Sequence, residues 1–249
     1  MIARHGWVIL DQKYLDLTYL WSLAVEEHFY LFWPFMVWFL SERSLARACL
    51  AIIMIAPALR GLTMFLGQME TATYVMTQCR MDSLATGALL AVLVHNKAPA
   101  EILRRFGWIG LISGLLLVTY FAQSFRLPGF ADERFRQAPP FRIFGYSVVA
   151  FAFASLICVV LVGGWTTNLM SWRPLRFFGV YSYGIYIYHG ILLRYLMTWF
   201  TADRLSFNTG HAWLGVIPHY VLCISASTLI AVLSYHLLEK PFLKLKRLF

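Results

Sequence analysis

Seven apolar stretches, separated by short polar ones, run along the chain. They cover residues 20–40, 46–66, 81–95, 106–122, 144–163, 177–200 and 214–238. An α-helix needs about 20 apolar residues to cross the hydrocarbon core of a bilayer, and only the stretch 81–95 is clearly shorter. The pattern predicts an all-α polytopic transmembrane helix bundle of about seven spans. Since no internal repeat or linker separates the stretches, it also predicts one membrane domain over residues 1–249.

Composition supports a membrane protein and excludes two other classes. Residues of the AVILMFWYC set make up 60% of the chain and charged residues only 13%, against roughly 25% charged in soluble domains. This supply of charge is too small to cover the surface of a soluble protein. Aromatic residues reach 17%, which excludes a disordered chain, because disordered chains contain few aromatics.

The net charge of +9 is best explained by basic cytoplasmic loops. No run of lysine and arginine is present, so we expect no nucleic-acid partner. Lysines and arginines are more frequent on one side of the alternating loops, and the basic segment 240–249 adds to that side. This bias predicts a multi-pass protein of the cell (plasma) membrane with its C-terminus in the cytoplasm and its N-terminus outside. The four cysteines form no CxxC pair, and no metal site is predicted.

Two adjacent carboxylates interrupt the first apolar stretch. Glu26 and Glu27 lie about two turns into it, and an ionisable residue inside a span costs about 2.5–3.5 kcal/mol on insertion scales. One interpretation places both side chains in water at the outer interface. The other makes them buried carboxylates that orient a base or hold an arginine.

Arg80 and Asp82 lie at the start of the third stretch. Asp82 could simply cap this helix, with Arg80 at the level of the lipid headgroups. Alternatively both belong to a polar site. A separation of two residues puts them on different faces of a helix, so they need not pair with each other.

Polar residues also mark the last two stretches. Ser182, Tyr186 and His189 are spaced for one stripe of a helix, which favours a cavity-lining face with His189 as a proton carrier or ligand contact.

Glu239 lies at the end of the last predicted helix, where the macrodipole disfavours an anion. It therefore needs a cationic partner. One interpretation is a salt bridge to Lys240 or the lysines that follow, and the other is a role for Glu239 near an anionic cofactor. Pro241 is predicted to end this helix.

These constellations, in this order, resemble the acyltransferase-3 family of integral membrane acyltransferases. The family hallmark WSLAVEExFYLxWP is matched by WSLAVEEHFYLFWP at residues 21–34. Weaker elements match RMDSLATGALLA at 80–91, SYGIYIYH at 182–189 and EKP at 239–241. Arg60 resembles an arginine often found in the helix after the hallmark.

The resemblance implies about ten helices and transfer of an acyl group, usually acetyl, to a hydroxyl. The donor would be acetyl-CoA or another acyl-CoA as co-substrate, with no bound cofactor. The acceptor would be an extracytoplasmic glycan or lipid-linked sugar, and lipids would surround the protein. On this hypothesis Glu26, Glu27 and His189 support catalysis, and the remaining polar residues line the substrate path: Arg80, Asp82, Ser182, Tyr186 and Glu239.

Two family features have no counterpart in this sequence. The family's proposed catalytic histidine lies in its first helix and an Arg-x-x-Arg motif near its third, and neither an apolar helix with a histidine nor this motif precedes the hallmark here. With seven spans instead of ten, we expect an N-terminally truncated domain without the first three helices. Two alternatives stay open: a catalytically inactive fragment, and a membrane transporter or channel, since intramembrane Glu, Arg and His also mark ion paths.

Overall fold

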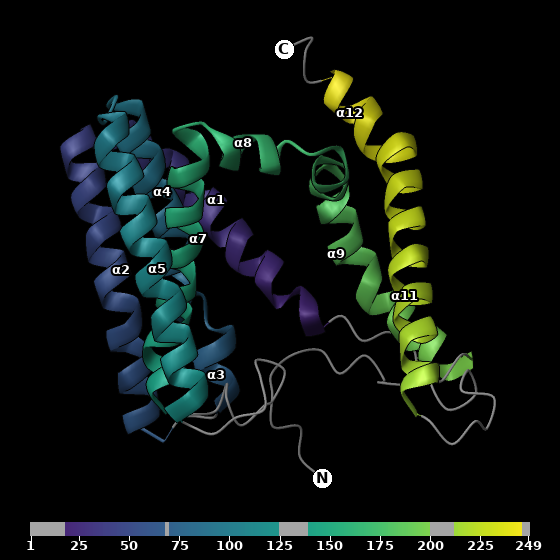
Figure 1. Ribbon diagram of the computed structural model, residues 1–249. Helices are drawn as coiled ribbons and strands as arrows, with labels where there is room; N and C mark the ends of the chain where they lie inside the picture. Colours follow the sequence, from purple (N-terminus) through teal and green to yellow (C-terminus); the bar gives the residue numbers. More distant parts are fainter. Residues whose placement is uncertain (1–17, 68–69, 125–138, 200–211, 246–249) are drawn as a thin grey trace. The chain divides into compact units, whose positions relative to one another are not determined.

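The computed structural model describes residues 18–67, 70–124, 139–199 and 212–245, and these residues are almost entirely helical (Figure 1). No strand occurs within these ranges. The helices form two units. One is Trp21–Met170, and the other is Ser171–Phe249 together with Met1–Leu20. The two units are described separately.

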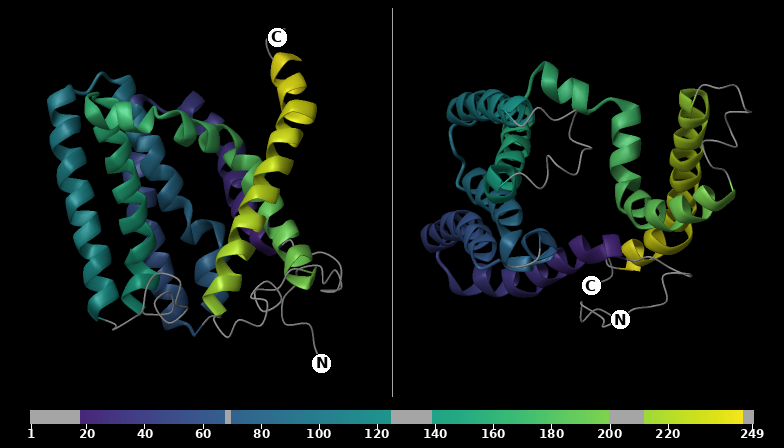
Figure 2. Two further views of the ribbon diagram at one scale, coloured as in Figure 1. Left: turned by 45° about the vertical axis from the view of Figure 1, so that its right-hand side comes forward. Right: turned by 90° about the horizontal axis from the view of Figure 1, so that it is seen from below.

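The unit Trp21–Met170 is built from long helices that run up and down beside one another. The helix α4 packs against both α2 and α7, and α7 packs against α5 (Figure 2). A polar residue on α4 can therefore reach partners on two neighbouring helices. The elements are α1 (Trp21–Phe39), α2 (Glu42–Phe65), α3 (Glu70–Val75), the 3₁₀ turn η2 (Thr77–Cys79), α4 (Met81–His95), α5 (Ala100–Ser124), the π-helical turn η3 (Phe141–Gly145), α7 (Tyr146–Leu161) and α8 (Trp165–Met170).

A seam of glycines lets α5 and α7 approach closely. A Cβ added at Gly114 would lie 2.8 Å from the Cβ of Ala152, and one added at Gly110 would lie 2.2 Å from Oγ of Ser155. Small residues are enriched between membrane helices because backbones that approach closely gain van der Waals contact. The seam fixes the position of α7, which contributes to the site described below.

The second unit contains η1 (Thr18–Leu20), α9 (Arg173–Trp199), α11 (Ala212–Ser234), the π-helical turn η4 (Tyr235–Glu239) and α12 (Lys240–Leu245). The helices α9 and α11 pack together, and Gly184 meets Ala231 at their contact. The sequence predicted that Pro241 ends the last helix. This prediction is wrong, because α12 continues through Pro241. The π-helical turn before α12 shifts the hydrogen-bond register where proline supplies no amide proton.

Each of the seven predicted apolar stretches is helical over nearly all of its described residues, and the stretch 81–95 has the bounds of α4. Among the residues that the structure describes, four helices are long and apolar enough to cross a membrane: Glu42–Phe65, Ala100–Tyr120, Phe141–Leu161 and Ile217–Lys244. The helix α4 is apolar but shorter. The polar groups of α1 and the tyrosines and histidine of α9 lower the hydropathy of those two helices. The all-α, multi-pass architecture is confirmed, and the count of seven spans stays a prediction.

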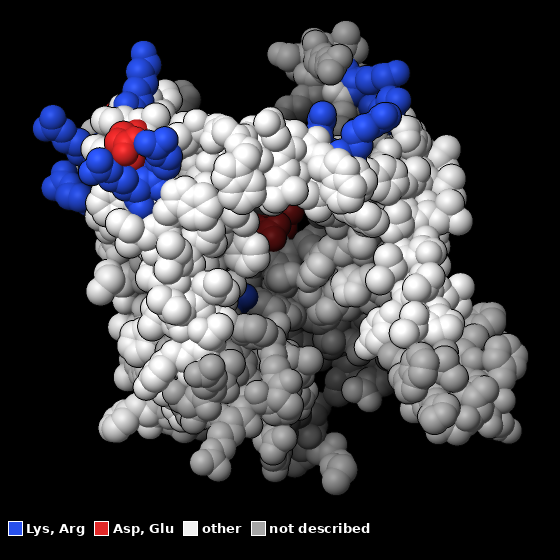
Figure 3. Space-filling model, in the orientation of Figure 1, with Lys and Arg blue, Asp and Glu red and all other residues white. Residues whose placement is uncertain are grey.

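The surface of the unit Trp21–Met170 is apolar along the helices and charged at one end. Large side chains such as Trp38 and Phe65 are more than four-fifths exposed, as expected for contact with lipid tails. Lysine and arginine gather where α2 and α5 begin (Figure 3). Glu42 on α2 pairs with His95 at the end of α4, at 3.5 Å, and Glu101 on α5 pairs with Arg105, at 3.0 Å. We call this the basic end of the unit.

Candidate functional site

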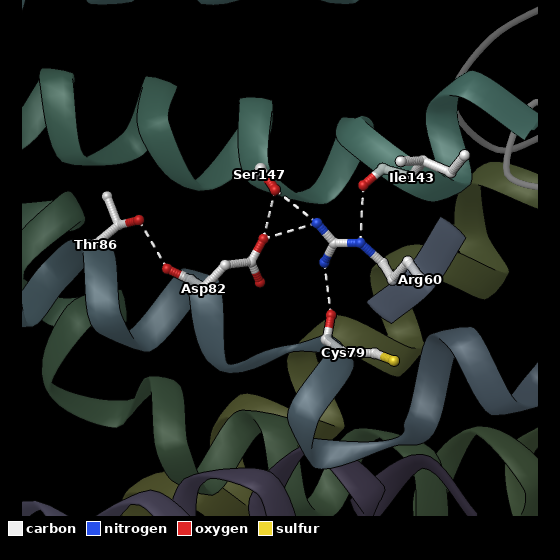
Figure 4. A network of polar contacts seen from close by, with 6 residues as sticks. All are labelled: Arg60, Cys79, Asp82, Thr86, Ile143 and Ser147. Carbon is white, nitrogen blue, oxygen red and sulfur yellow. Dashed lines mark hydrogen bonds and ion pairs between the residues drawn. The ribbon is translucent and has the colours of Figure 1, made fainter. Parts of the chain in front are cut away.

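A buried ion pair joins α2 to α4. Nη2 of Arg60 lies 2.9 Å from Oδ2 of Asp82, and neither side chain is exposed at all (Figure 4). Arg60 lies in the last two turns of α2 and Asp82 in the first turn of α4. A charge buried without a partner costs several kcal/mol, so each of these residues requires the other.

The remaining nitrogens of Arg60 are also hydrogen-bonded. Nε donates to the carbonyl of Ile143 at 2.8 Å, and Nη1 donates to the carbonyl of Cys79 at 2.5 Å. Nη2 also donates to Oγ of Ser147 at 2.6 Å, and this hydroxyl donates to Oδ2 of Asp82 at 2.5 Å. The guanidinium thus ties α2 to η2, η3, α4 and α7 (Figure 4).

Asp82 does not cap α4. The N-cap position is Arg80, which makes no side-chain capping bond. The Asp82 carboxylate bonds to Arg60 and Ser147 instead, since a fully buried guanidinium is a stronger partner than a helix amide. Its second oxygen, Oδ1, is buried and has no hydrogen-bond partner within the described part of the chain.

Arg80 is held by aromatic rings. Its Cζ lies 4.2 Å from the ring centre of Tyr146 and 5.5 Å from those of Tyr74 and Trp21. We call these three rings the aromatic cage. Nη1 of Arg80 is buried and, among the described residues, has no hydrogen-bond partner. Arg80 and Asp82 contact different groups, as their separation by two residues allows.

The two carboxylates of the hallmark differ in exposure. Glu26 is partly buried and Glu27 is exposed on α1. Neither forms an ion pair with any residue that the structure describes. The next residue, His28, places Nδ1 2.9 Å from Oγ1 of Thr77, which links α1 to η2. The predicted roles of Glu26 and Glu27 stay predictions.

In the second unit, Tyr186 and His189 form a compact cluster with Tyr19. The Tyr186 hydroxyl donates to the carbonyl of Tyr19 at 2.6 Å, and the Tyr19 hydroxyl donates to the carbonyl of Ile187 at 2.5 Å. The ring of His189 lies edge-on to that of Tyr19, with centroids 5.3 Å apart. Gly190 makes room for this ring, because a Cβ there would lie 2.4 Å from it.

The hydrogen bond of His189 defines its tautomer. Nδ1 lies 2.5 Å from the carbonyl oxygen of Tyr186. A carbonyl only accepts, so Nδ1 carries the proton and the neutral ring keeps its lone pair on Nε2. This is the arrangement of an imidazole that can remove a proton from a substrate.

Ser182 and Glu239 lie apart from this cluster. Ser182 is exposed, and its hydroxyl donates to the carbonyl of Gly179 at 2.9 Å, so it bonds to its own helix. Glu239 is partly buried and, within the described ranges, forms no ion pair with Lys240. It lines a shallow apolar depression of about 370 Å³ with Tyr183 and Phe242. Their predicted places along a substrate path stay predictions.

Sequence reasoning missed several members of these clusters. Ser147 is an isolated hydroxyl in an apolar stretch, and Tyr146 and Tyr74 resemble ordinary interfacial aromatics. Tyr19 precedes the hallmark and lies in the three-residue 3₁₀ turn η1, from which it contacts Tyr186 and His189. The usable signal was Arg60, a charge inside a predicted span, which requires a buried partner.

Comparisons with known proteins agree with the motifs. The family model described as an acyltransferase domain, of the acyltransferase-3 type, matches residues 3–236. A Bacillus subtilis (strain 168) protein, YrhL, provisionally named a peptidoglycan O-acetyltransferase, is 28% identical over 89% of this chain and 34% of its own length. The peptidoglycan O-acetyltransferase OatA of Listeria monocytogenes (EGD-e) is 25% identical over 90% of this chain and 35% of its own.

The O-acetyltransferase OatA of Staphylococcus aureus (NCTC 8325) is 24% identical over 92% of this chain and 36% of its own length. The chain thus spans about a third of the length of these curated relatives. No solved structure matches it significantly. Since the family model covers nearly the whole sequence, from residue 3 to residue 236, the chain belongs to the acyltransferase-3 family.

Proposed function

We propose that this chain is the membrane acyltransferase region of a protein that transfers an acetyl group to a hydroxyl of an extracytoplasmic glycan. The observation that carries the proposal is the family match over residues 3–236. The names of the relatives, which are O-acetyltransferases and in two cases peptidoglycan O-acetyltransferases, support acetyl as the group and a glycan such as peptidoglycan as the acceptor.

The donor in this proposal is acetyl-CoA, or another acyl-CoA, supplied from the cytoplasm. Cytoplasmic loops carry an excess of lysine and arginine, so the basic end of the unit Trp21–Met170 is the cytoplasmic side. Exposed cations there include Arg43, Arg47, Arg104 and Arg105. Guanidinium groups match phosphate geometry, which supports entry of a phosphate-bearing donor from this side. The same charge bias favours a cytoplasmic C-terminus.

The reaction needs a base and a group that stabilises negative charge. The acceptor oxygen attacks the thioester carbonyl, its C–O bond forms, and the C–S bond to coenzyme A breaks. The hydroxyl proton passes to the base and from there to the departing thiolate. The carbonyl oxygen becomes negative in the transition state and requires a hydrogen-bond donor or cation nearby.

His189 is the proposed base, because its Nδ1 bond to the Tyr186 carbonyl leaves the lone pair on Nε2. Tyr186 has a positioning role, since its carbonyl orients the ring. Glu26 and Glu27 are the proposed orienting carboxylates of the acceptor region. Asp82 is assigned a positioning role through Arg60, and Ser182 and Glu239 are proposed to lie along the substrate path.

Membranes that contain the protein, incubated with isotopically labelled acetyl-CoA and peptidoglycan fragments, test the proposal. We expect label on the glycan that mild alkali releases, as an O-ester requires. Cooperative unfolding of the protein in these membranes shows that it is folded. Absence of alkali-labile label from the glycan with such a folded protein would contradict the proposal. Movement of glycan across the membrane without any acetylation would instead favour a transporter.

A further inference from the structure

Arg80 is partly buried, aromatic rings hold its guanidinium, and it forms no ion pair with any carboxylate in the described part of the chain. Its guanidinium lies over Tyr146 at 4.2 Å and within 5.5 Å of both Tyr74 and Trp21. Cation–π contacts attract a cation through the ring quadrupole and leave its formal charge in place. The aromatic cage therefore stabilises the position of the guanidinium and keeps its full charge available.

The buried carboxylate next to Arg80 in the sequence is that of Asp82. Its Oδ2 accepts hydrogen bonds from Arg60 and Ser147, and its Oδ1 has no hydrogen-bond partner among the described residues. Arg80 forms no ion pair with any residue that the structure describes, and its Nη1 is buried with no acceptor among them. Two arginines thus share one carboxylate in this part of the fold. An arginine remains protonated in proteins, so the cluster carries one excess positive charge.

A buried donor without an acceptor is costly, and so is an uncompensated charge. Both costs disappear when an oxyanion binds to Nη1. Because Arg80 is partly buried and its Nη1 is inaccessible, a charge-assisted hydrogen bond formed there is stronger than one on the surface. These properties are those of a site built for an anion that binds and leaves.

The position of Arg80 along α4 indicates which substrate carries this anion. Arg80 precedes the first residue of α4, whereas His95 at the other end pairs with Glu42 at the basic end. The helix has 15 residues, a length of about 22 Å at 1.5 Å per residue. If the basic end is cytoplasmic, Arg80 lies toward the extracytoplasmic side.

We propose that Arg80 binds an acidic group, a carboxylate or a phosphate, on the extracytoplasmic acceptor. The inference rests on the proposed function, in which the basic end is cytoplasmic and the acceptor binds from the opposite side. It assigns Arg80 as a specificity-determining residue, one that selects an acidic glycan over a neutral one. A carboxylate or phosphate oxygen of the glycan accepts the hydrogen bond from Nη1 of Arg80.

Binding to the purified protein in phosphatidylcholine nanodiscs tests this directly. The probes are trigalacturonate, its carboxyl-reduced neutral counterpart and coenzyme A, titrated at constant ionic strength by calorimetry. One charge-assisted hydrogen bond corresponds to roughly 10- to 100-fold in affinity. We expect trigalacturonate to bind about that much more tightly than the neutral sugar. Arg80→Gln should remove the difference and Arg80→Lys should keep part of it, whereas the control Arg176→Gln, at an exposed position of α9, should leave it intact.

The stability of Arg80→Met supplies a second readout. Removing a partly buried charge that forms no ion pair among the described residues should leave the melting temperature equal or higher while anion binding is lost. A structural arginine would give a lower melting temperature with unchanged anion binding, and that result would overturn the proposal. Equal affinity of the wild-type protein for both sugars would also overturn it, as would an Arg80-dependent site for coenzyme A alone.

Failure of this inference is distinguishable from failure of the proposed function. Acetyl transfer that is equally fast to acidic and neutral glycans would reject the role of Arg80 and leave the acyltransferase intact. Arg80-dependent binding of trigalacturonate in a protein that transfers no acetyl group would support the anion site and reject the acyltransferase.

Discussion

The Arg60 guanidinium and the Asp82 carboxylate face each other at 2.9 Å, both fully buried, across the contact of α2 and α4. The same guanidinium bonds to carbonyls on η2 and η3 and to a hydroxyl on α7. This one pair therefore sets the relative positions of the segments that carry Arg80 and Tyr146.

Removing one partner of the pair should destabilise the protein strongly. Asp82→Ala leaves the Arg60 charge buried and unpaired, which costs about 3–5 kcal/mol. Chemical unfolding in detergent, followed by circular dichroism, measures the loss. The milder change Ser147→Ala removes only one hydroxyl from the network and should cost about 1–3 kcal/mol.

Removing both partners should be far less damaging. In the double variant Arg60→Met with Asp82→Leu no buried charge remains, and apolar replacements of a buried pair are often neutral or stabilising. A double variant as unstable as Asp82→Ala would show that the hydrogen bonds of Arg60 to backbone carbonyls, and not the ion pair, hold these helices.

The glycine seam gives a second stability prediction. Gly114→Ala places a Cβ 2.8 Å from that of Ala152, so α5 and α7 must separate, at a cost of about 1–3 kcal/mol. The matched control is Gly87→Ala on α4, where nothing lies within 4 Å. That change should be neutral or stabilising by up to about 1 kcal/mol. Equal effects of the two substitutions on the melting temperature would contradict the packing described for α5 and α7.

The sequence predicted the helices well because apolar runs of bilayer length have few other structures available. It singled out Asp82 at the start of a predicted span, and Arg60 through the resemblance to the family. It could not pair the two. Spacing rules relate residues of one helix, and these two lie on different helices. Ser147 and Tyr19 carried no signal at all, since one hydroxyl in an apolar run is ordinary. The π-helical turn beside Pro241 also depends on a change in register that no composition rule predicts.

His189 should be required for transfer. In the proposed function its Nε2 removes the acceptor proton, and general base catalysis contributes about 10²–10⁴-fold. His189→Gln keeps a polar side chain of similar size and should lower the rate of acetyl transfer by about that factor, with little change in melting temperature. His236→Gln is the control, because His236 is exposed and lies outside the cluster of Tyr19, Tyr186 and His189, with its Nε2 3.3 Å from the Tyr181 hydroxyl. Equal rates in the two variants would exclude His189 as the base.

The basic end and the C-terminal segment should both face the cytoplasm. Cysteines introduced at Arg43 and Lys244, which are exposed, should react with a membrane-impermeant maleimide only after the cells are permeabilised. The unsubstituted protein, with four free cysteines that are buried or partly buried, gives the background. Labelling of Arg43→Cys in intact cells would reverse the orientation and place Arg80 on the donor side.

In the proposed function this membrane domain moves an acetyl group from a cytoplasmic thioester to a glycan on the opposite side. Proteoliposomes that hold labelled acetyl-CoA inside and peptidoglycan fragments outside measure this transfer. We expect alkali-labile acetyl on the external glycan with the wild-type protein and almost none with His189→Gln. Intact, correctly oriented proteoliposomes that leave the external glycan unacetylated would contradict it.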